Sequence, residues 1–260
     1  MKTKLLLILL SVSFVCPSVA HAEDFDLFAQ DVTPELDSIA STNELVSATE
    51  KLIARGIYNS NIGKSVSNAS IIKLNMMGES ESLTVTNVVR KTNSRVSYAA
   101  SNSKMDTLSI SENAGKVVGS LWQDGKLYKL RPASDGSTLL IEVSNESLID
   151  HPADYHENID SGQKDVDSKD ETSSAAPQSD SSREFTVIVA YTSAFASVAG
   201  NVSAYMDLLE LETNTSYSNS GVNTSVKIVH SYQTNYTDSD DFYTDRTYFL
   251  NGVNGYAAEL

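Results

Sequence analysis

Histidine is the residue type in this chain best suited to bind a catalytic metal, so its positions are the first to consider. The chain has four histidines, at His21, His151, His156 and His230. A zinc site needs about three ligands in one cluster, often from a His-Glu-x-x-His helix, and that motif does not occur. His151 and His156 are five positions apart around Pro152, so they do not share a helix face. We therefore assign no catalytic, cofactor-binding or metal-binding residue in this chain.

Other patterns that carry chemistry are equally sparse. There is no Gly-x-Ser-x-Gly nucleophile elbow and no phosphate-binding Gly-Lys-Ser/Thr loop. The acidic run at 238–241 has oxygen ligands suited to calcium, but it lacks the glycine and the terminal glutamate of an EF-hand loop. We interpret it as a solvated acidic turn. Trp122 is interpreted as a core residue or hairpin anchor, with a ligand platform as the alternative.

Residues 1–22 are predicted to be a secretory signal peptide. Two early lysines precede an apolar stretch from Leu5 to Cys16 that is too short to span a bilayer, and Ala20-His21-Ala22 supplies the cleavage site. Cys16 is the only cysteine, so the mature chain is expected to have no disulfide and no thiol ligand. The protein is therefore predicted to be secreted, in an extracellular or periplasmic location.

The overall charge restricts the class of partner. With 19 basic and 34 acidic residues, the formal net charge is −15. Nucleic acid and anionic membrane surfaces both require clustered Lys and Arg. We therefore expect no nucleic-acid partner, and no membrane contact after signal cleavage. The hydrophobic content of 40% is enough to form a core.

Residues 23–151 are predicted to form a β-rich unit with two short helices at its start. Thr33-Pro34-Glu35 places a capping residue, a proline at the first helical position and an acid in the first turn. Ser41 to Glu44 reads as a capping box. It predicts a helix ending near Gly56, with these apolar residues on one side: Leu45, Ala48, Leu52 and Ile53.

From position 65 to 145 the apolar residues alternate with polar ones, which is typical of half-buried strands. Alternating segments meet across Asp124-Gly125, a strong signal for a two-residue hairpin. A further strand is expected from Ser137 to Val143. These features predict one antiparallel sheet with a hydrophobic face.

Residues 152–183 form a polar stretch rich in serine and acidic residues, which we interpret as an exposed linker. Residues 184–260 have a different pattern. An apolar strand at 185–191, apolar on both faces as if covered by helices, precedes an amphipathic helix at 202–217. Gly221 ends the helix, a strand follows at 224–230, and another helix begins before Leu260. Strand, helix and strand in this order predict a crossover with parallel strands.

Several of these segments resemble secreted metzincin proteases, specifically the reprolysin-like bacterial zinc proteases of the peptidyl-Asp metalloendopeptidase type. The run from Glu184 to Ser193 is similar to the first strand of their catalytic domain. Further matching segments are Glu212-Thr213-Asn214, 217–222 and 236–238; segments 119–122, 127–132 and 141–151 are similar to the preceding propeptides.

The resemblance implies an α+β fold, with an antiparallel β-rich propeptide followed by the N-terminal part of a metzincin-like α/β zincin catalytic domain. It implies a precursor of a zinc metalloendopeptidase that acts on protein or peptide substrates. The family's zinc ligands are on a later helix, which we expect to be missing from these 260 residues. The chain by itself is then expected to be inactive. The alternative is a non-enzymatic secreted binding protein or a protease inhibitor.

Overall fold

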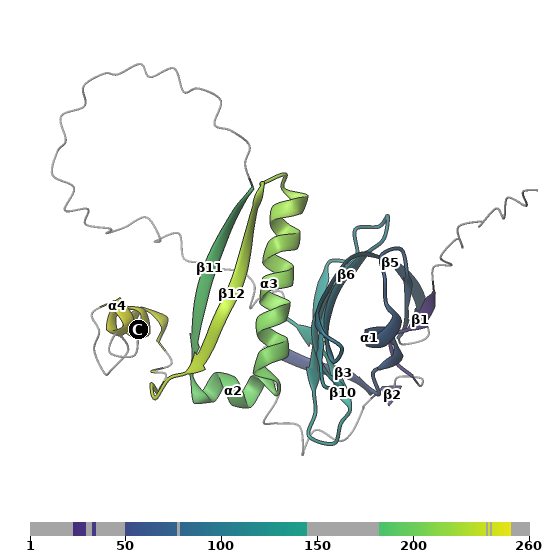
Figure 1. Ribbon diagram of the computed structural model, residues 1–260. Coiled ribbons are helices and arrows are strands. Elements are labelled where there is room, and N and C mark those ends of the chain that lie inside the picture. The colour runs from purple at the N-terminus through teal and green to yellow at the C-terminus, as the bar shows by residue number, and fades with distance from the viewer. Residues whose placement is uncertain are drawn as a thin grey trace, which may run out of the picture.

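The computed structural model describes residues 23–29, 33–34, 50–76, 79–144, 182–237, 239 and 241–250. The predicted signal peptide, almost all of the predicted linker, and His151 and His156 lie outside these residues. Figure 1 shows two parts side by side, a curled sheet and a smaller strand–helix–strand unit. We call residues 23–144 the β unit.

The β unit is a curled sheet of ten strands, broadly the antiparallel sheet that the sequence predicts. Its strands, in the spatial order β1-β4-β5-β6-β7-β8-β9-β10-β3-β2, are β1 Asp24–Asp26, β2 Thr33–Pro34, β3 Glu50–Gly56, β4 Ile71–Met76, β5 Glu79–Thr92, β6 Arg95–Ser101, β7 Thr107–Asn113, β8 Lys116–Gln123, β9 Lys126–Pro132 and β10 Thr138–Val143. All neighbouring pairs are antiparallel except β1 and β4, which pair in parallel.

The sheet curls until the segments beside its two ends meet. Phe28 and Tyr58 form an isolated antiparallel bridge, and the amide of Ala29 donates to the carbonyl of Ile57 at 2.7 Å. The short helix α1 (Asn61–Ser65) lies inside the curl (Figure 1) and buries Ile62. Every buried residue of the resulting hydrophobic core belongs to the β unit. The β unit therefore has a core that does not depend on the remainder of the described chain.

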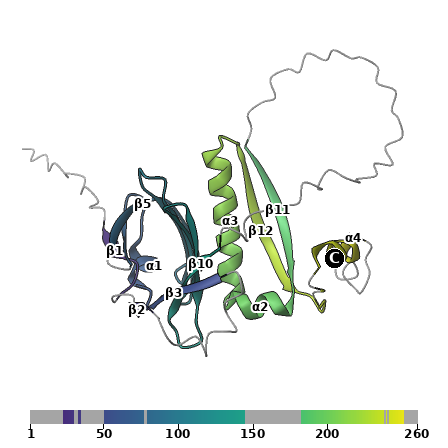
Figure 2. The same ribbon diagram turned by 180° about the vertical axis from the view of Figure 1, so that it is seen from behind.

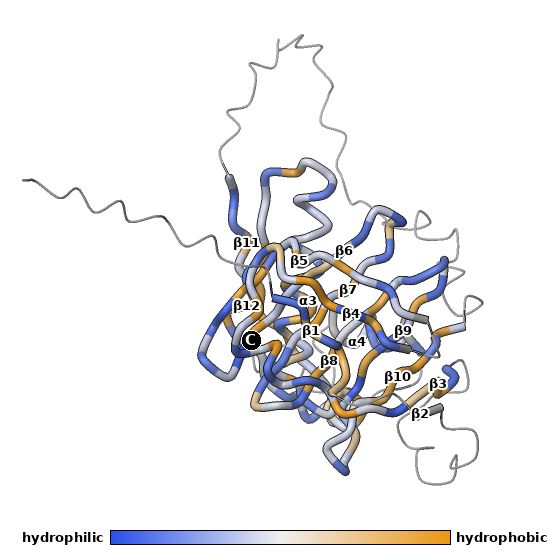
Figure 3. Tube along the Cα trace, turned by 90° about the vertical axis from the view of Figure 1, so that its right-hand side faces the viewer, coloured by the Kyte–Doolittle hydropathy of each residue, from blue (hydrophilic) through white to orange (hydrophobic). Residues whose placement is uncertain are grey.

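The hairpin predicted at Asp124-Gly125 is confirmed. Both residues have positive φ, 50° and 74°, which is the conformation of a type I′ turn. The amide of Asp124 also donates to Asp106 Oδ1 at 3.2 Å. In Figure 3 the hairpin ends are mostly hydrophilic, while apolar positions lie within the strands.

Replacing Gly125 with alanine is expected to lower the free energy of unfolding by about 1 kcal/mol, because a Cβ is disfavoured at positive φ. Chemical denaturation of the two chains would measure this. Gly125→Asn is the matched control, since asparagine tolerates left-handed backbone, and it should cost less. Equal losses for both variants would contradict a conformational cause.

Two predicted helices are wrong. Thr33–Pro34 is a short edge strand paired with β3, and Leu52 and Ile53 lie within β3 itself. Proline is tolerated at a sheet edge. The apolar residues within 50–56 are compatible with one face of a strand as well as with one face of a helix. Pairing of β3 with β10 satisfies the backbone of both strands, so tertiary pairing overrides the local capping signals. Leu45 and Ala48 lie outside the described residues.

The second part confirms the predicted strand–helix–strand order. It consists of β11 Arg183–Tyr191, α2 Ser193–Ala199, α3 Val202–Asn219, β12 Thr224–Gln233 and α4 Phe242–Leu250. Strands β11 and β12 pair in parallel. Helix α3 begins at Asn201, whose side chain accepts from the amide of Ala204, and Gly221 follows its end at φ 67°. Helix α2 is absent from the sequence prediction.

Helix α3 lies between the two sheets. It contacts β12 on one side and β6, β7 and β8 on the other, as both ribbon views show (Figures 1 and 2). The prediction that β11 is covered on both faces is wrong for the residues described. Phe185 is 56% exposed and Ile188 is 54% exposed. Only the tertiary arrangement shows that α3 covers β12 and the β unit and leaves apolar side chains of β11 open.

Candidate functional site

The most elaborate polar site in the described chain is the seam between α3 and the outer face of the β unit. Along β6, β7 and β8, alternate residues point into the core, and the intervening ones in the middle of these strands are small. These outward residues include Ser97, Ala99, Ser109, Ser111, Val118 and Ser120. Small side chains permit a helix to approach closely. At the centre, Val118 forms a buried apolar cluster with Ala204 and Leu208.

Asp207 is the charged residue at the centre of this seam. Its side chain is only 1% exposed. The guanidinium of Arg95 donates to both carboxylate oxygens, through Nη2 to Oδ1 at 2.8 Å and through Nε to Oδ2. Lys91 Nζ lies 2.8 Å from Oδ1 and 3.1 Å from Glu210 Oε1. A buried carboxylate is tolerated only when it is paired in this way.

The sequence prediction missed Asp207. It places the apolar stripe of the helix on Val202, Met206, Leu209, Tyr205 and Leu208, but Leu209 is 38% exposed and Asp207 is buried. The available signal was an acid flanked by Met206 and Leu208 on an otherwise apolar face. Its cationic partners could not be identified from sequence, because Arg95 is 112 residues away in the chain.

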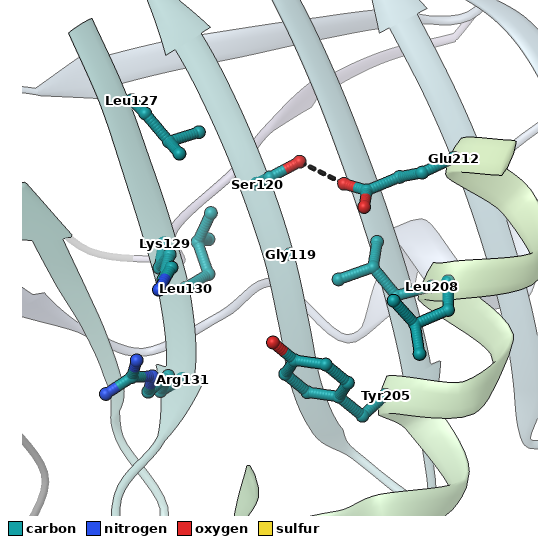
Figure 4. Close-up of a pocket in the computed structure, with 10 residues that line it drawn as sticks. Gly119, Ser120, Leu127, Lys129, Leu130, Arg131, Tyr205, Leu208 and Glu212 are labelled. Atoms are coloured by element: carbon teal, nitrogen blue, oxygen red, sulfur yellow. Dashed lines mark hydrogen bonds between the residues drawn. The ribbon is translucent and has the colours of Figure 1, made fainter. Parts of the chain in front are cut away.

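The third acidic residue of α3, Glu212, binds the β unit further along the helix. The hydroxyl of Ser120 donates to its Oε1. Figure 4 shows Glu212, Leu208 and Tyr205 extending from α3 toward β8 and β9. They border a cleft of about 210 Å³. On the β9 wall, Lys129 and Arg131 lie beside the cleft and bind Glu50 of β3 at 3.1 Å and 2.6 Å.

Burial in the seam raises the pKa of Glu212, and the hydrogen bond from Ser120 partly opposes this effect. A raised pKa means that the protonated carboxyl favours the docked state. Its contribution to stability is complete below the pKa of the free side chain, and it is lost as pH rises through the docked pKa. The nearby cations Lys129 and Arg131 are already paired with Glu50.

Glu212→Gln is therefore expected to match the parent chain at low pH and to be more stable by about 1 kcal/mol at pH 8, since glutamine never ionises. Thermal unfolding of both chains from pH 4 to pH 8 would test this. Glu184→Gln, at an exposed position of β11, is the control and should show no gain in stability over the parent chain at pH 8. A difference between Glu212→Gln and the parent that is constant with pH would contradict the assignment.

The opposite side of α3 holds β12. The side-chain amide of Asn214 both donates to the carbonyl of Val226 and accepts from its amide, at 2.9 and 2.7 Å. Glu210 Oε2 accepts from the amide of Ile228 at 2.8 Å. These contacts satisfy backbone groups along the edge of β12 that another strand would otherwise pair. Polar residues of one helix therefore hold together both parts of the described chain.

The other sequence candidates are not brought together. His230 is an exposed residue of β12 whose ring stacks on Tyr232 at 5.9 Å. Asp241 directly precedes α4, where its carboxylate accepts from the amide of Tyr243 at 3.1 Å, while Asp238 lies outside the described residues. Trp122 is 42% exposed. The interpretation of Trp122 as a core residue is therefore wrong, because it lies on the outer face of β8.

The described residues do not form a metal centre. Among them there is no group of three or more histidine, cysteine or acidic side chains that could hold an ion, so this part of the chain does not fit the zinc that the resemblance implies. Asp207 and Glu210 are two acids bound by Lys91, an arrangement suited to an ion pair. Within the same residues, no helix combines the length and apolar character needed to cross a bilayer.

Comparison of the sequence with known proteins finds metalloendopeptidases among its relatives. No family model matches the chain. Two peptidyl-Asp metalloendopeptidases of Stenotrophomonas maltophilia, from strains R551-3 and K279a, are 33% and 30% identical to it over 173 residues, which is 64% of this chain and 40% of theirs. A third, from Xanthomonas campestris pv. campestris, is 30% identical over 144 residues, 54% of this chain and 33% of that protein.

These similarities relate the chain to metalloendopeptidases. The named relatives are of the peptidyl-Asp type, and the chain spans less than half of their length. Among solved structures, a chain from a chaperone–substrate complex matches with a TM-score of 0.30 and 11% identity, covering 39% of this chain and 93% of that chain. A likeness this weak carries no argument about fold or function.

Proposed function

We propose that this chain belongs to the precursor of a secreted zinc metalloendopeptidase of the metzincin type that hydrolyses peptide bonds in protein or peptide substrates. The β unit is its propeptide, and residues 182–250 belong to the N-terminal part of its catalytic domain. The observation that carries the proposal is the similarity to three named metalloendopeptidases, which extends over as much as 64% of the chain.

The docked arrangement supports the division into a propeptide and an enzyme part. The β unit has its own core, and its contact with the second part is concentrated on one helix. Such an interface allows one folded part to hold another through contacts that do not depend on the segment joining them. Latency then arises from docking of the β unit, because no cysteine follows the predicted signal peptide.

A region exchange tests the activity. The matched region of the Stenotrophomonas maltophilia R551-3 relative is replaced by the aligned residues of this chain, and the secreted product is assayed for casein hydrolysis with and without a metal chelator. We expect activity that the chelator abolishes. A secreted, folded exchange protein without activity, beside an active parent, would overturn the proposal.

The alternative, a secreted protease inhibitor, is separated by a second assay. Purified residues 23–260 of this chain are added to the active relative. Inhibition of the relative by the added chain, together with an inactive exchange protein, would favour the inhibitor. An active exchange protein supports the precursor.

A further inference from the structure

The surface of the β unit beneath α3 has the properties of a specific helix receptor. The outward side chains in the middle of β6, β7 and β8 are small, and the largest apolar one among them, Val118, is 1% exposed beneath Ala204 and Leu208. The cations Lys91 and Arg95 flank this surface at the end of the β5–β6 hairpin. The surface therefore combines an apolar centre at Val118, to which a helix can approach closely, with a positively charged edge formed by Lys91 and Arg95.

Helix α3 is complementary in shape and in charge. Its sequence has three acids and no basic residue. Two of the acids, Asp207 and Glu210, meet the positive edge, and Glu212 meets Ser120. Asn201, which caps the helix, also donates to the carbonyl of Asn113 at 3.2 Å. Contacts therefore extend from the N-cap to the fourth turn of the helix.

We propose that this surface is a receptor for the acidic helix α3 and continues to bind it after the chain is cut between residues 144 and 182. The β unit then remains bound as a separate polypeptide. The buried pair of Asp207 with Arg95 supplies the specificity, since the side chain of Asp207 is only 1% exposed and solvent therefore cannot readily replace a lost partner. This binding requires neither a metal nor peptidase activity, so it goes beyond the proposed function.

The experiment begins with the folded chain of residues 23–260, carrying a recognition site for a sequence-specific protease inserted between positions 160 and 170. The chain is cut under native conditions and passed over a size-exclusion column at micromolar concentration. We expect the two pieces to elute together. Two folded pieces that elute separately would overturn the proposal.

A double-mutant cycle then tests the pair that we hold responsible. Arg95→Ala leaves Asp207 buried with one cation fewer, and it should weaken the association of the cut pieces at least about thirtyfold. In an Asp207→Asn background the same change should have a much smaller effect. An equal loss in both backgrounds would overturn the role of the pair.

Two further variants keep the test clear of folding defects. Lys104→Ala removes an exposed ion pair between Lys104 and Glu81, both residues of the β unit, and should leave the association unchanged. Lys91→Met removes the cation that makes a single contact with Asp207 and retains an apolar stem, so a folded variant is available if Arg95→Ala does not fold. Its association should be several-fold weaker; unchanged association would count against the receptor. Because the readout is binding, separation of the pieces beside an active exchange protein would refute the receptor alone.

Discussion

Val118→Asp should release helix α3 from the β unit. The side chain of Val118 is 1% exposed and forms a buried cluster with Ala204 and Leu208 of α3. An unpaired carboxylate there costs about 3–5 kcal/mol if the helix stays docked, so undocking, which returns the charge to water, is the less costly outcome. Backbone amides of α3 should then exchange hydrogen much faster, while those of β7 and β9 remain protected.

The control for this variant is Lys116→Asp, which places the same carboxylate on the same strand at an exposed position. It should leave exchange in α3 unchanged. Retained protection of α3 in Val118→Asp would show that the seam does not depend on its apolar centre. Loss of protection throughout the β unit would show that the two parts fold as one cooperative unit.

Residues 182–250 produced without the β unit should fail to fold cooperatively. Two strands and a covering helix are marginal by themselves, and removal of the β unit exposes the apolar face of α3 in addition to the open face of β11. Asp207 would also lose both of its cationic partners. We expect a broad thermal transition and dye binding typical of exposed apolar surface.

The matched measurement uses residues 23–144 alone. They contain every buried residue of the main core, so a single sharp transition is expected for them. A cooperative transition of 182–250 alone would show that this part needs no support from the β unit. Its folding on addition of separately prepared 23–144 would instead support the receptor described above.

The sequence by itself predicted those elements whose signals are local. The Asp124-Gly125 hairpin follows from a two-residue turn that needs positive φ. The order of β11, α3 and β12 follows from the change between periods of 2 and 3.6, and Gly221 marks the end of α3 for its left-handed conformation. The resemblance to metalloendopeptidases also came from sequence, and the named relatives support it.

Tertiary structure alone decided what each surface meets. Residues 50–56 carry helix signals, but they complete the sheet because β10 requires a partner strand. The outward serines of β6 to β8 have the pattern of a solvated face, yet they form the seat of α3. The sequence indicates no partner for Asp207, and only the folded structure places Arg95 beside it. Pairings between residues a hundred positions apart depend on the geometry of the whole fold, and no local pattern in the chain specifies them.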